Sequence, residues 1–202
     1  MKNSKKIIIS LGVVAVAIII ALSITLGALA AKIATINTAI TVGYTSTEVS
    51  AKVSATYKEA SASTAIVMKN GDDESITFDG NESTATGSLT CPNIDLTSDN
   101  KSVVFVYTFE NTGDSAFYVN GTIPSTQTNV TITAISDSDT SDSTDAVTNT
   151  ISSNSLTQIE VAGHKTATIT ITVAITEIRN NASFSGNFQW TLTNVYSKTT
   201  SD

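Results

Sequence analysis

Cysteine and histidine, the residue types that most readily supply a nucleophile and a general base near neutral pH, occur once each in this sequence, as Cys91 and His164. A zinc site of the His-Glu-x-x-His kind needs a second histidine, so a Cys91–His164 pair would be the one thiol–imidazole dyad within reach. Cys91 precedes Pro92 between two apolar runs, and His164 follows Gly163 directly before another run. These positions favour an inert small thiol and a turn histidine. Since the sequence also has no Gly-rich phosphate loop and no Gly-x-Ser-x-Gly elbow, we expect neither an enzyme nor a cofactor.

A cluster of carboxylates is the remaining candidate site. Calcium takes six or more oxygens from carboxylates and carbonyls, so a Ser/Asp-rich segment at 136–155 could wrap one ion. The spacing departs from an EF-hand, which has a glycine at its sixth position and a bidentate glutamate at its twelfth. We therefore interpret the segment as a solvated acidic loop between strands, with no metal assigned. Its calcium candidates are Asp137, Asp139, Asp142 and Asp145.

The N-terminus predicts export. Residues 1–6 include three lysines, and residues 7–31 contain no charged side chain. By the positive-inside rule, the N-terminus stays in the cytoplasm and the rest of the chain lies outside. A run this long favours a retained membrane-spanning helix, whereas Ala28 and Ala30 before Ala31 form a small-x-small cleavage site. Residues 1–30 are therefore predicted to be either a signal peptide or a hydrophobic anchor helix, and both outcomes stay open.

The composition after this segment is typical of an exported β protein. Serine and threonine contribute 26 and 34 of the 202 residues, and only 14% of residues are charged. Helical enzymes prefer Glu, Lys, Arg and Ala on their surfaces. From Ala31 onward, 18 acidic residues face 8 basic ones, a net charge of −10, which argues against a nucleic-acid partner. No small-molecule substrate is evident either, and a single cysteine leaves core burial to stabilise the domain.

Alternation of apolar and hydroxyl-bearing residues predicts strands that bury one face. The stretch from Val103 to Phe109 is apolar at nearly every position, which predicts a central strand covered on both faces. Turn signals at Asn70-Gly71 and at residues 111–114 predict hairpins. The fold class is therefore all-β, a single antiparallel β-sandwich of eight to ten strands over residues 48–202, either jelly-roll or Ig-like. The alternating ranges are 49–57, 130–134, 167–175 and 188–192.

Residues 31–47 form a separate strand-capable segment ahead of this domain. Ile40, Val42 and Tyr44 alternate with polar residues, and apolar character continues back through Ile36 and Ile33. Such a segment must bury its apolar face, either within its own sandwich or by addition to the open edge of a neighbouring subunit. The candidate residues for strand addition are Ile33, Ile36, Ile40 and Val42. If addition drives assembly, removing residues 31–42 should leave a soluble sandwich that no longer polymerises.

Four stretches, in order along the chain, carry a family resemblance. They are Ser10-Leu11-Gly12, Gly87-Ser88-Leu89, the run from Phe105 to Asp114, and a final strand from Phe184 to Leu192. In this order they resemble the TasA/camelysin family of exported jelly-roll proteins. That family assembles into biofilm-matrix or surface fibres. The resemblance implies a jelly roll, self-assembly and an extracellular or cell-surface location.

Two functions follow from these observations. The first is an exported structural surface protein, a subunit of an extracellular fibre or matrix that is assembled by strand addition. The second is a membrane-anchored, adhesin-like binding module that retains its N-terminal helix and presents loops such as 136–155 to a ligand. The N-terminal residue of the native protein separates the two, because Ala31 favours secretion and assembly whereas Met1 favours anchoring.

Overall fold

The computed structural model describes residues 34–36, 40–97, 99–122, 130–138, 149–151, 155–175, 182–184 and 187–195. All of them belong to one compact unit, Ile33–Asp202. No helix among these residues has the length and apolar character needed to cross a membrane. The predicted signal peptide or anchor at 1–30, including the cleavage residues Ala28, Ala30 and Ala31, lies outside the described residues, as does Ile33.

The described residues form strands and the turns that connect them, as their alternating pattern predicts. The strands are β1 (Ala34–Ile36), β2 (Thr41–Thr47), β3 (Ala51–Glu59), β4 (Ile66–Val67), β5 (Ser75–Phe78), β6 (Ala85–Thr90), β7 (Ile94–Leu96), β8 (Ser102–Asn111), β9 (Phe117–Thr122), β10 (Val130–Ser138), β11 (Asn149–Ile151), β12 (Ser155–Val161), β13 (Thr166–Ile175), β14 (Ala182–Phe184) and β15 (Phe188–Thr193). This exceeds the expected eight to ten, mainly because several strands have only two or three residues.

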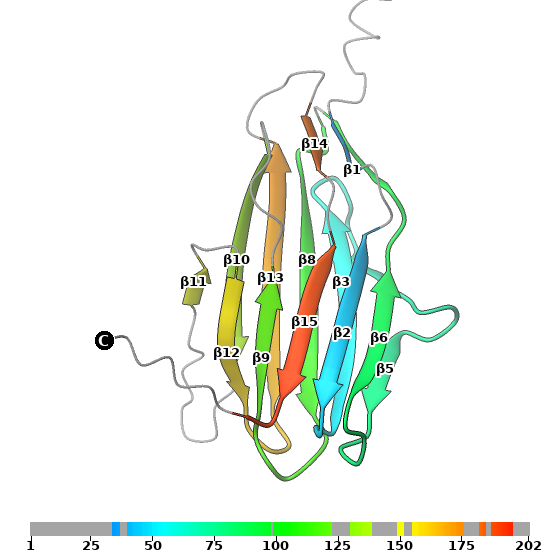
Figure 1. Cartoon of the computed structure of the whole chain (residues 1–202). Helices are drawn as coiled ribbons and strands as arrows, with labels where there is room; N and C mark the ends of the chain where they lie inside the picture. Colours follow the sequence, from blue (N-terminus) through cyan, green and yellow to red (C-terminus); the bar gives the residue numbers. More distant parts are fainter. Residues whose placement is uncertain are drawn as a thin grey trace, which may run out of the picture. The chain divides into compact units, whose positions relative to one another are not determined.

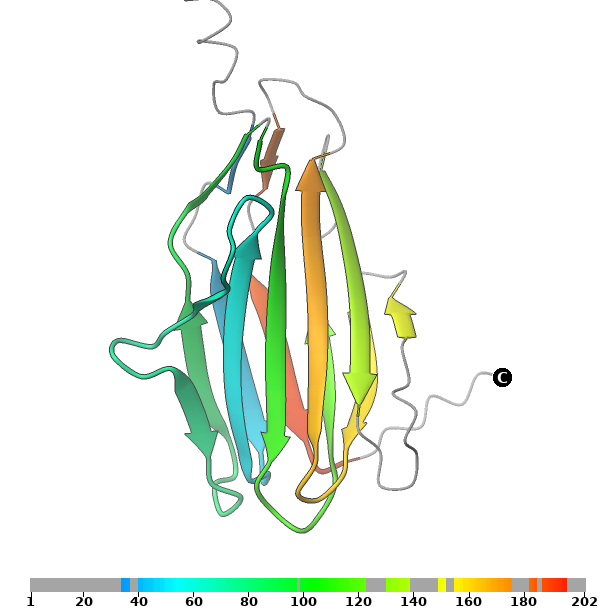
Figure 2. The ribbon, with the colours of Figure 1, turned by 180° about the vertical axis from the view of Figure 1, so that it is seen from behind.

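Two sheets pack face to face as a sandwich, which confirms the all-β prediction. The larger sheet has the order β11-β10-β13-β8-β3-β4, and β5 also pairs with β3. The smaller sheet has the order β12-β9-β15-β2-β6. Figure 1 shows the smaller sheet in front, and Figure 2 shows the larger sheet from the opposite side. A third, three-stranded sheet, β14-β1-β7, lies at one end of the sandwich.

Most strand pairs are antiparallel, but two are parallel. Strand β2 runs parallel to β15, from the pair Val42–Phe188 to the pair Thr47–Thr193, and β1 runs parallel to β14. The prediction of a purely antiparallel sandwich is therefore wrong for these pairs. The partners lie at opposite ends of the sequence, so no short turn forces them into an antiparallel arrangement.

Aromatic side chains join the two sheets. From β8 in the larger sheet, Phe105 packs on Phe188 with ring centroids 5.6 Å apart, and Tyr107 packs on Trp190 at 5.2 Å. Phe109 meets Trp190 edge-on at 5.8 Å. Aromatic side chains bury large apolar areas and gain about 1 kcal/mol more per well-oriented pair. The core therefore centres where β8 faces β15 and β2.

Strand β8 is central, between β3 and β13, but only one of its faces is covered. Phe105 and Tyr107 are fully buried, whereas Val104 and Val106 on the opposite face are only partly buried. The expectation that both faces are covered is therefore wrong. β-Branched apolar residues suit an outward sheet face as well as a core, so a continuous apolar run does not require a second layer.

The two turn signals have different outcomes. At the first, the backbone N–H of Asn70 donates to Asp73 O at 2.9 Å, and Gly71 has a φ of 64°. The flanking strands β4 and β5, however, each pair with β3 and not with one another. The second signal, residues 111–114, carries the chain from β8 in the larger sheet to β9 in the smaller one. A turn signal marks where the chain reverses but not which strand becomes the partner.

The acidic segment 136–155 is not one continuous loop. Residues 136–138 extend β10, and β11 pairs with β10 in the register Ser136–Asn149. Asp137 thus lies within β10, opposite Thr168 of β13. The other three calcium candidates, Asp139, Asp142 and Asp145, lie outside the described residues.

Candidate functional site

Strand β2 and the residue directly before it account for two of the four candidate residues for strand addition. Ile40, directly before it, and Val42 within it are fully buried, as is Tyr44. The strand lies between β15 and β6, and the Cys91 N–H donates to Ile40 O at 3.0 Å. Within one chain this segment therefore pairs inside its own sandwich. Ile36 lies apart from it in β1, in register with Ile94 of β7.

This placement corrects the expectation about the deletion. Removing residues 31–42 takes Ile40 and Val42 out of the core and removes two of the six β2–β6 register pairs. Large-to-small changes of single core residues already cost about 2–5 kcal/mol. The truncated chain would therefore expose core surface and would not be a complete soluble sandwich.

The outer strands of both sheets are poorly suited to accept a further strand. In β12, a bulge lies between Leu156 and Ile159, where Gln158 has a φ of 58°. In β6, Thr90 is already paired across its outer side by two backbone hydrogen bonds with Lys69. At the edges of the larger sheet, β11 has three residues, β4 two and β5 four. Bulges and short strands are the features by which proteins prevent edge-to-edge pairing.

The connection between β2 and β3 holds backbone strain. It consists of Glu48, Val49 and Ser50, and Glu48 has a φ of 53° although it is not a glycine. Its N–H donates to Glu82 O at 3.1 Å. A left-handed backbone conformation costs a residue with a side chain about 1–2 kcal/mol. The joint between β2 and the rest of the sandwich is therefore short and strained.

A pocket of about 360 Å³ opens at the same end of the sandwich. Two of its three carboxylates are already engaged by amides: Asp79 Oδ1 accepts from Asn81 Nδ2 at 3.0 Å, and Glu48 Oε2 accepts from Asn194 Nδ2 at 3.2 Å. None of the described residues that line it is a lysine or arginine. Among the described residues, no group of three or more His, Cys, Asp or Glu side chains could hold a metal ion. The polar residues lining it are Glu48, Ser50, Asp79, Asn81, Asp114, Ser115 and Asn194.

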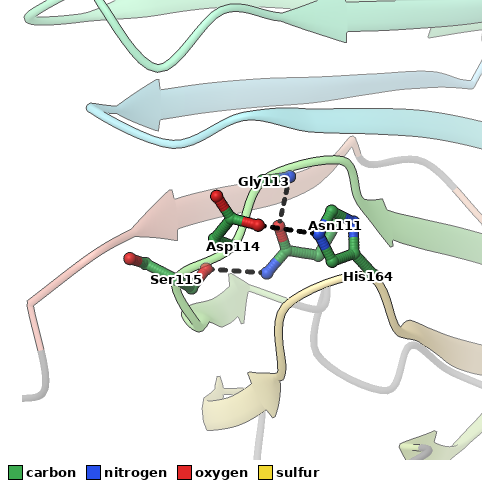
Figure 3. A network of polar contacts seen from close by, with 5 residues as sticks. All are labelled: Asn111, Gly113, Asp114, Ser115 and His164. Atoms are coloured by element: carbon green, nitrogen blue, oxygen red, sulfur yellow. Dashed lines mark hydrogen bonds and ion pairs between the residues drawn. The ribbon is translucent and has the colours of Figure 1, made fainter.

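Buried Asn111 lies beside this pocket and forms hydrogen bonds to two connections, the one that follows β8 and the one between β12 and β13 (Figure 3). Its Nδ2 donates to the backbone oxygens of Ser115 and Val161, both at 2.9 Å, and its Oδ1 accepts from Gly113 N at 2.9 Å. The Asn111 backbone N–H also donates to Lys165 O at 2.9 Å. Because each of these contacts is to backbone, the asparagine has a structural role.

His164 is a turn residue, as predicted. It lies between β12 and β13 with a φ of 58°, and its Nε2 is 2.9 Å from Asp114 Oδ1 (Figure 3). The side chains are 67% and 98% exposed, so this pair contributes little to stability. Its partner is thus a surface carboxylate beside the pocket.

Cys91 and His164 do not form a dyad. Cys91 is buried beside Ile40 at the start of β2, whereas the contact of His164 with Asp114 lies beyond the other end of that strand. Seven strand residues span about 23 Å. Burial also raises the pKa of the Cys91 thiol to about 11, so it stays protonated at neutral pH and is a poor nucleophile.

Sequence reasoning did not find the pocket, because its lining comes from separate connections. Glu48 follows β2, Asp79 follows β5, Asp114 follows β8 and Asn194 follows β15. No spacing in the sequence links these positions. Asn111, by contrast, belongs to the stretch from Phe105 to Asp114 that carries the family resemblance.

No protein-family model matches this chain, and none of the curated proteins matches it. Among solved structures, the yeast delta-COP-I mu-homology domain is similar over 78% of this chain and 96% of that chain. The sequence identity is 10% and the TM-score is 0.22. A TM-score this low carries no argument, so the candidate site is interpreted from its own geometry.

Proposed function

We propose that this protein is an exported structural surface protein, a subunit of an extracellular fibre or matrix in which β2 of one copy fills the β15–β6 slot of the next. The observation that carries the proposal is the position of β2. It is the first long strand of the sandwich, its inward side chains are fully buried, and it joins β3 through the strained connection at Glu48.

Strand exchange of this kind preserves the contacts of the single chain. When β2 leaves its own slot, Ile40, Val42 and Tyr44 lose their buried surroundings, and they regain the same surroundings in the neighbouring subunit. Extending the connection also releases the left-handed conformation of Glu48. Each subunit then gives one strand and receives one, and such a contact produces an open chain when its rotation does not close.

The slot between β15 and β6 is better suited to strand addition than the outer strands of either sheet. The bulge in β12, the pairing of β6 at Thr90 and the short outer strands of the larger sheet interrupt these edges, whereas the slot is continuous. The slot between β15 and β6 provides backbone partners on both sides. Addition there also buries a full set of alternate side chains, which is how strand addition gains specificity.

Export and the jelly-roll arrangement belong to the same proposal. Export rests on the lysine-rich start and the uncharged run at 7–31, with cleavage before Ala31 releasing the subunit. The resemblance to the TasA/camelysin family supports a jelly roll, fibres and a location in the biofilm matrix or on the cell surface.

A synthetic peptide of residues 38–48 tests the assembly mechanism. Added in excess to the full chain, it should occupy empty slots and shorten assemblies measured by sedimentation and electron microscopy. A control peptide with Val42→Asp and Tyr44→Asp should have no effect, because both side chains point into the core. Equal assembly with and without the first peptide would contradict strand exchange, as would a full chain that stays monomeric at high concentration.

The alternative is a membrane-anchored, adhesin-like binding module, and the pocket beside Glu48 favours it. Carboxylate and amide oxygens there suit a ligand with hydroxyl or amine donors. Mass spectrometry of the native N-terminus separates the two functions. Met1 at the N-terminus would favour the anchored module, and Ala31 would favour the released subunit.

A further inference from the structure

Three buried polar atoms on β2 and the strands around it have no hydrogen-bond partner among the described residues: Tyr44 Oη, Tyr107 Oη and Trp190 Nε1. Tyr44 in β2 and Trp190 in β15 are register neighbours. The Tyr107 ring from β8 packs on Trp190 at 5.2 Å. These unpartnered (orphaned) atoms therefore belong to side chains that pack together between β2, β15 and β8.

We infer that the buried Tyr44 hydroxyl, which has no hydrogen-bond partner, destabilises the closed position of β2 between β15 and β6. As a result, β2 opens separately from the other core strands. A buried hydroxyl without a partner destabilises the closed state, and it becomes hydrated when the strand leaves. Removing one such group should lower the opening equilibrium constant by about tenfold. The neighbouring orphans, Tyr107 Oη and Trp190 Nε1, act in the same direction because opening also admits water to them.

The chain connections make β2 the strand that can leave. Its C-terminal side is the strained joint at Glu48, and its N-terminal side leads to β1, which holds only three residue pairs with each of β7 and β14. By contrast, β8 pairs along nine positions with β3 and nine with β13. Burial also raises the pKa of both phenols, Tyr44 and Tyr107.

Cys91 reports this opening. It is the only cysteine of the chain, it is 1% exposed, and its N–H is bonded to Ile40 O at the start of β2. Because Cys91 is bonded to the residue directly before β2, we expect movement of β2 to admit a thiol reagent to it. The rate of labelling, divided by the rate for a free thiol at the same pH, therefore gives the equilibrium constant for opening.

The experiment labels the full chain, in mild detergent, with a disulfide reagent at pH 8. It compares the unchanged protein with Tyr44→Phe, and with Tyr57→Phe as a matched control. Tyr57 also lies in the core and, like Tyr107, interacts electrostatically with Cys91, so it controls for a direct effect of losing a phenol on the thiol; its hydroxyl is not among the orphaned atoms of the described residues. Global unfolding of each variant is measured separately, from the fluorescence of the single tryptophan, Trp190, in urea.

We expect the unchanged protein to label through an opening at least tenfold more populated than global unfolding. Tyr44→Phe should slow labelling about tenfold, and Tyr57→Phe should change it less than twofold. Tyr107→Phe, which removes a second orphan beside the slot, should also slow labelling several-fold. Labelling that matches global unfolding, or an unchanged rate in Tyr44→Phe, would overturn the inference.

The biological role of this opening rests on the proposed function, but the opening is a property of one chain. Sedimentation of the same samples therefore separates the two. If β2 opens as expected and no variant assembles, the fibre proposal fails and the inference stands. If the chains assemble but Tyr44→Phe labels at the unchanged rate, the inference fails and the fibre proposal stands.

Discussion

Replacing Gly121 by alanine tests how the core is packed. Gly121 in β9 is the register partner of Trp190 in β15, and the indole ring lies directly over it. A Cβ at this position would overlap ring atoms Cε3 and Cζ3 of Trp190. The ring has little room to retreat, since Tyr107 packs against it at 5.2 Å and Phe109 at 5.8 Å.

The overlap between the new Cβ and the Trp190 ring determines how much the substitution lowers the free energy of unfolding. Overpacking a core costs about 1–3 kcal/mol, and occasionally more. Because the alanine meets the largest fully buried side chain at the sheet interface, we expect a loss of about 3 kcal/mol in the free energy of unfolding. Alanine recovers less than about 1 kcal/mol of that by restricting the unfolded chain. At about 2–4 °C per kcal/mol for a domain of this size, Tm should fall by about 6–12 °C.

Urea unfolding followed by Trp190 fluorescence measures the effect. The matched control is Gly43→Ala in β2, whose Cβ would overlap only the side-chain amide of Gln189, an exposed group that can swing away. We expect the control to lose less than about 1 kcal/mol. A Gly121→Ala variant as stable as this control would show that the Trp190 ring does not rest on the glycine.

The remaining predictions concern polar groups. Asn111→Ala should cost about 2–4 kcal/mol in chemical unfolding, because it leaves the buried carbonyl of Val161 without its donor, whereas Asp114→Ala should be nearly neutral because that carboxylate is exposed. The raised pKa of Cys91, about 11, predicts stability that is full below about pH 9 and falls as the pH rises toward 11, by up to about 2–3 kcal/mol. In the Cys91→Ala variant, the free energy of unfolding measured in urea should depend less on pH between pH 9 and 10. This range lies below the one in which Tyr44 and Tyr107 contribute. Millimolar calcium should shift Tm little. A ligand that binds only the folded state, at 100 times its dissociation constant, adds about 2.7 kcal/mol to the free energy of unfolding, and we expect calcium to add far less. A rise of many degrees that disappears when the four candidate aspartates become asparagine would show that the acidic segment binds the ion.

The strands could be predicted from the sequence because their signal is local. Alternation at 49–57 and 167–175 corresponds to β3 and β13, and each buries the apolar residues of its alternating pattern. Partner choice is not local, and there the predictions fail. Nothing within residues 40–47 specifies that β2 runs parallel to a strand that begins at Phe188, nor do residues 111–114 specify a crossing between sheets.

In the candidate site, too, the local features could be predicted from the sequence and the contacts between distant segments could not. Burial of Ile40 and Val42 was predictable from their spacing, although the slot that receives them was not. The orphaned hydroxyl of Tyr44 was not predictable, because a tyrosine in an alternating strand normally keeps its hydroxyl at a partner or at the surface. The pocket beside Glu48 needs loops that are separated by up to 146 residues, and only the folded chain brings them together.

An interchain disulfide across the slot tests strand exchange most directly. Thr45 in β2 and Thr86 in β6 are register partners on the outward face. In a Cys91→Ala background, chains carrying Thr45→Cys are mixed with chains carrying Thr86→Cys, oxidised, and analysed by mass. Exchange predicts a disulfide-linked heterodimer, whereas Thr108→Cys mixed with Thr168→Cys, a pair between the inner strands β8 and β13, should give none. A double variant, Thr45→Cys with Thr86→Cys, that closes only within its own chain at every concentration, together with no heterodimer above the control, would contradict the account.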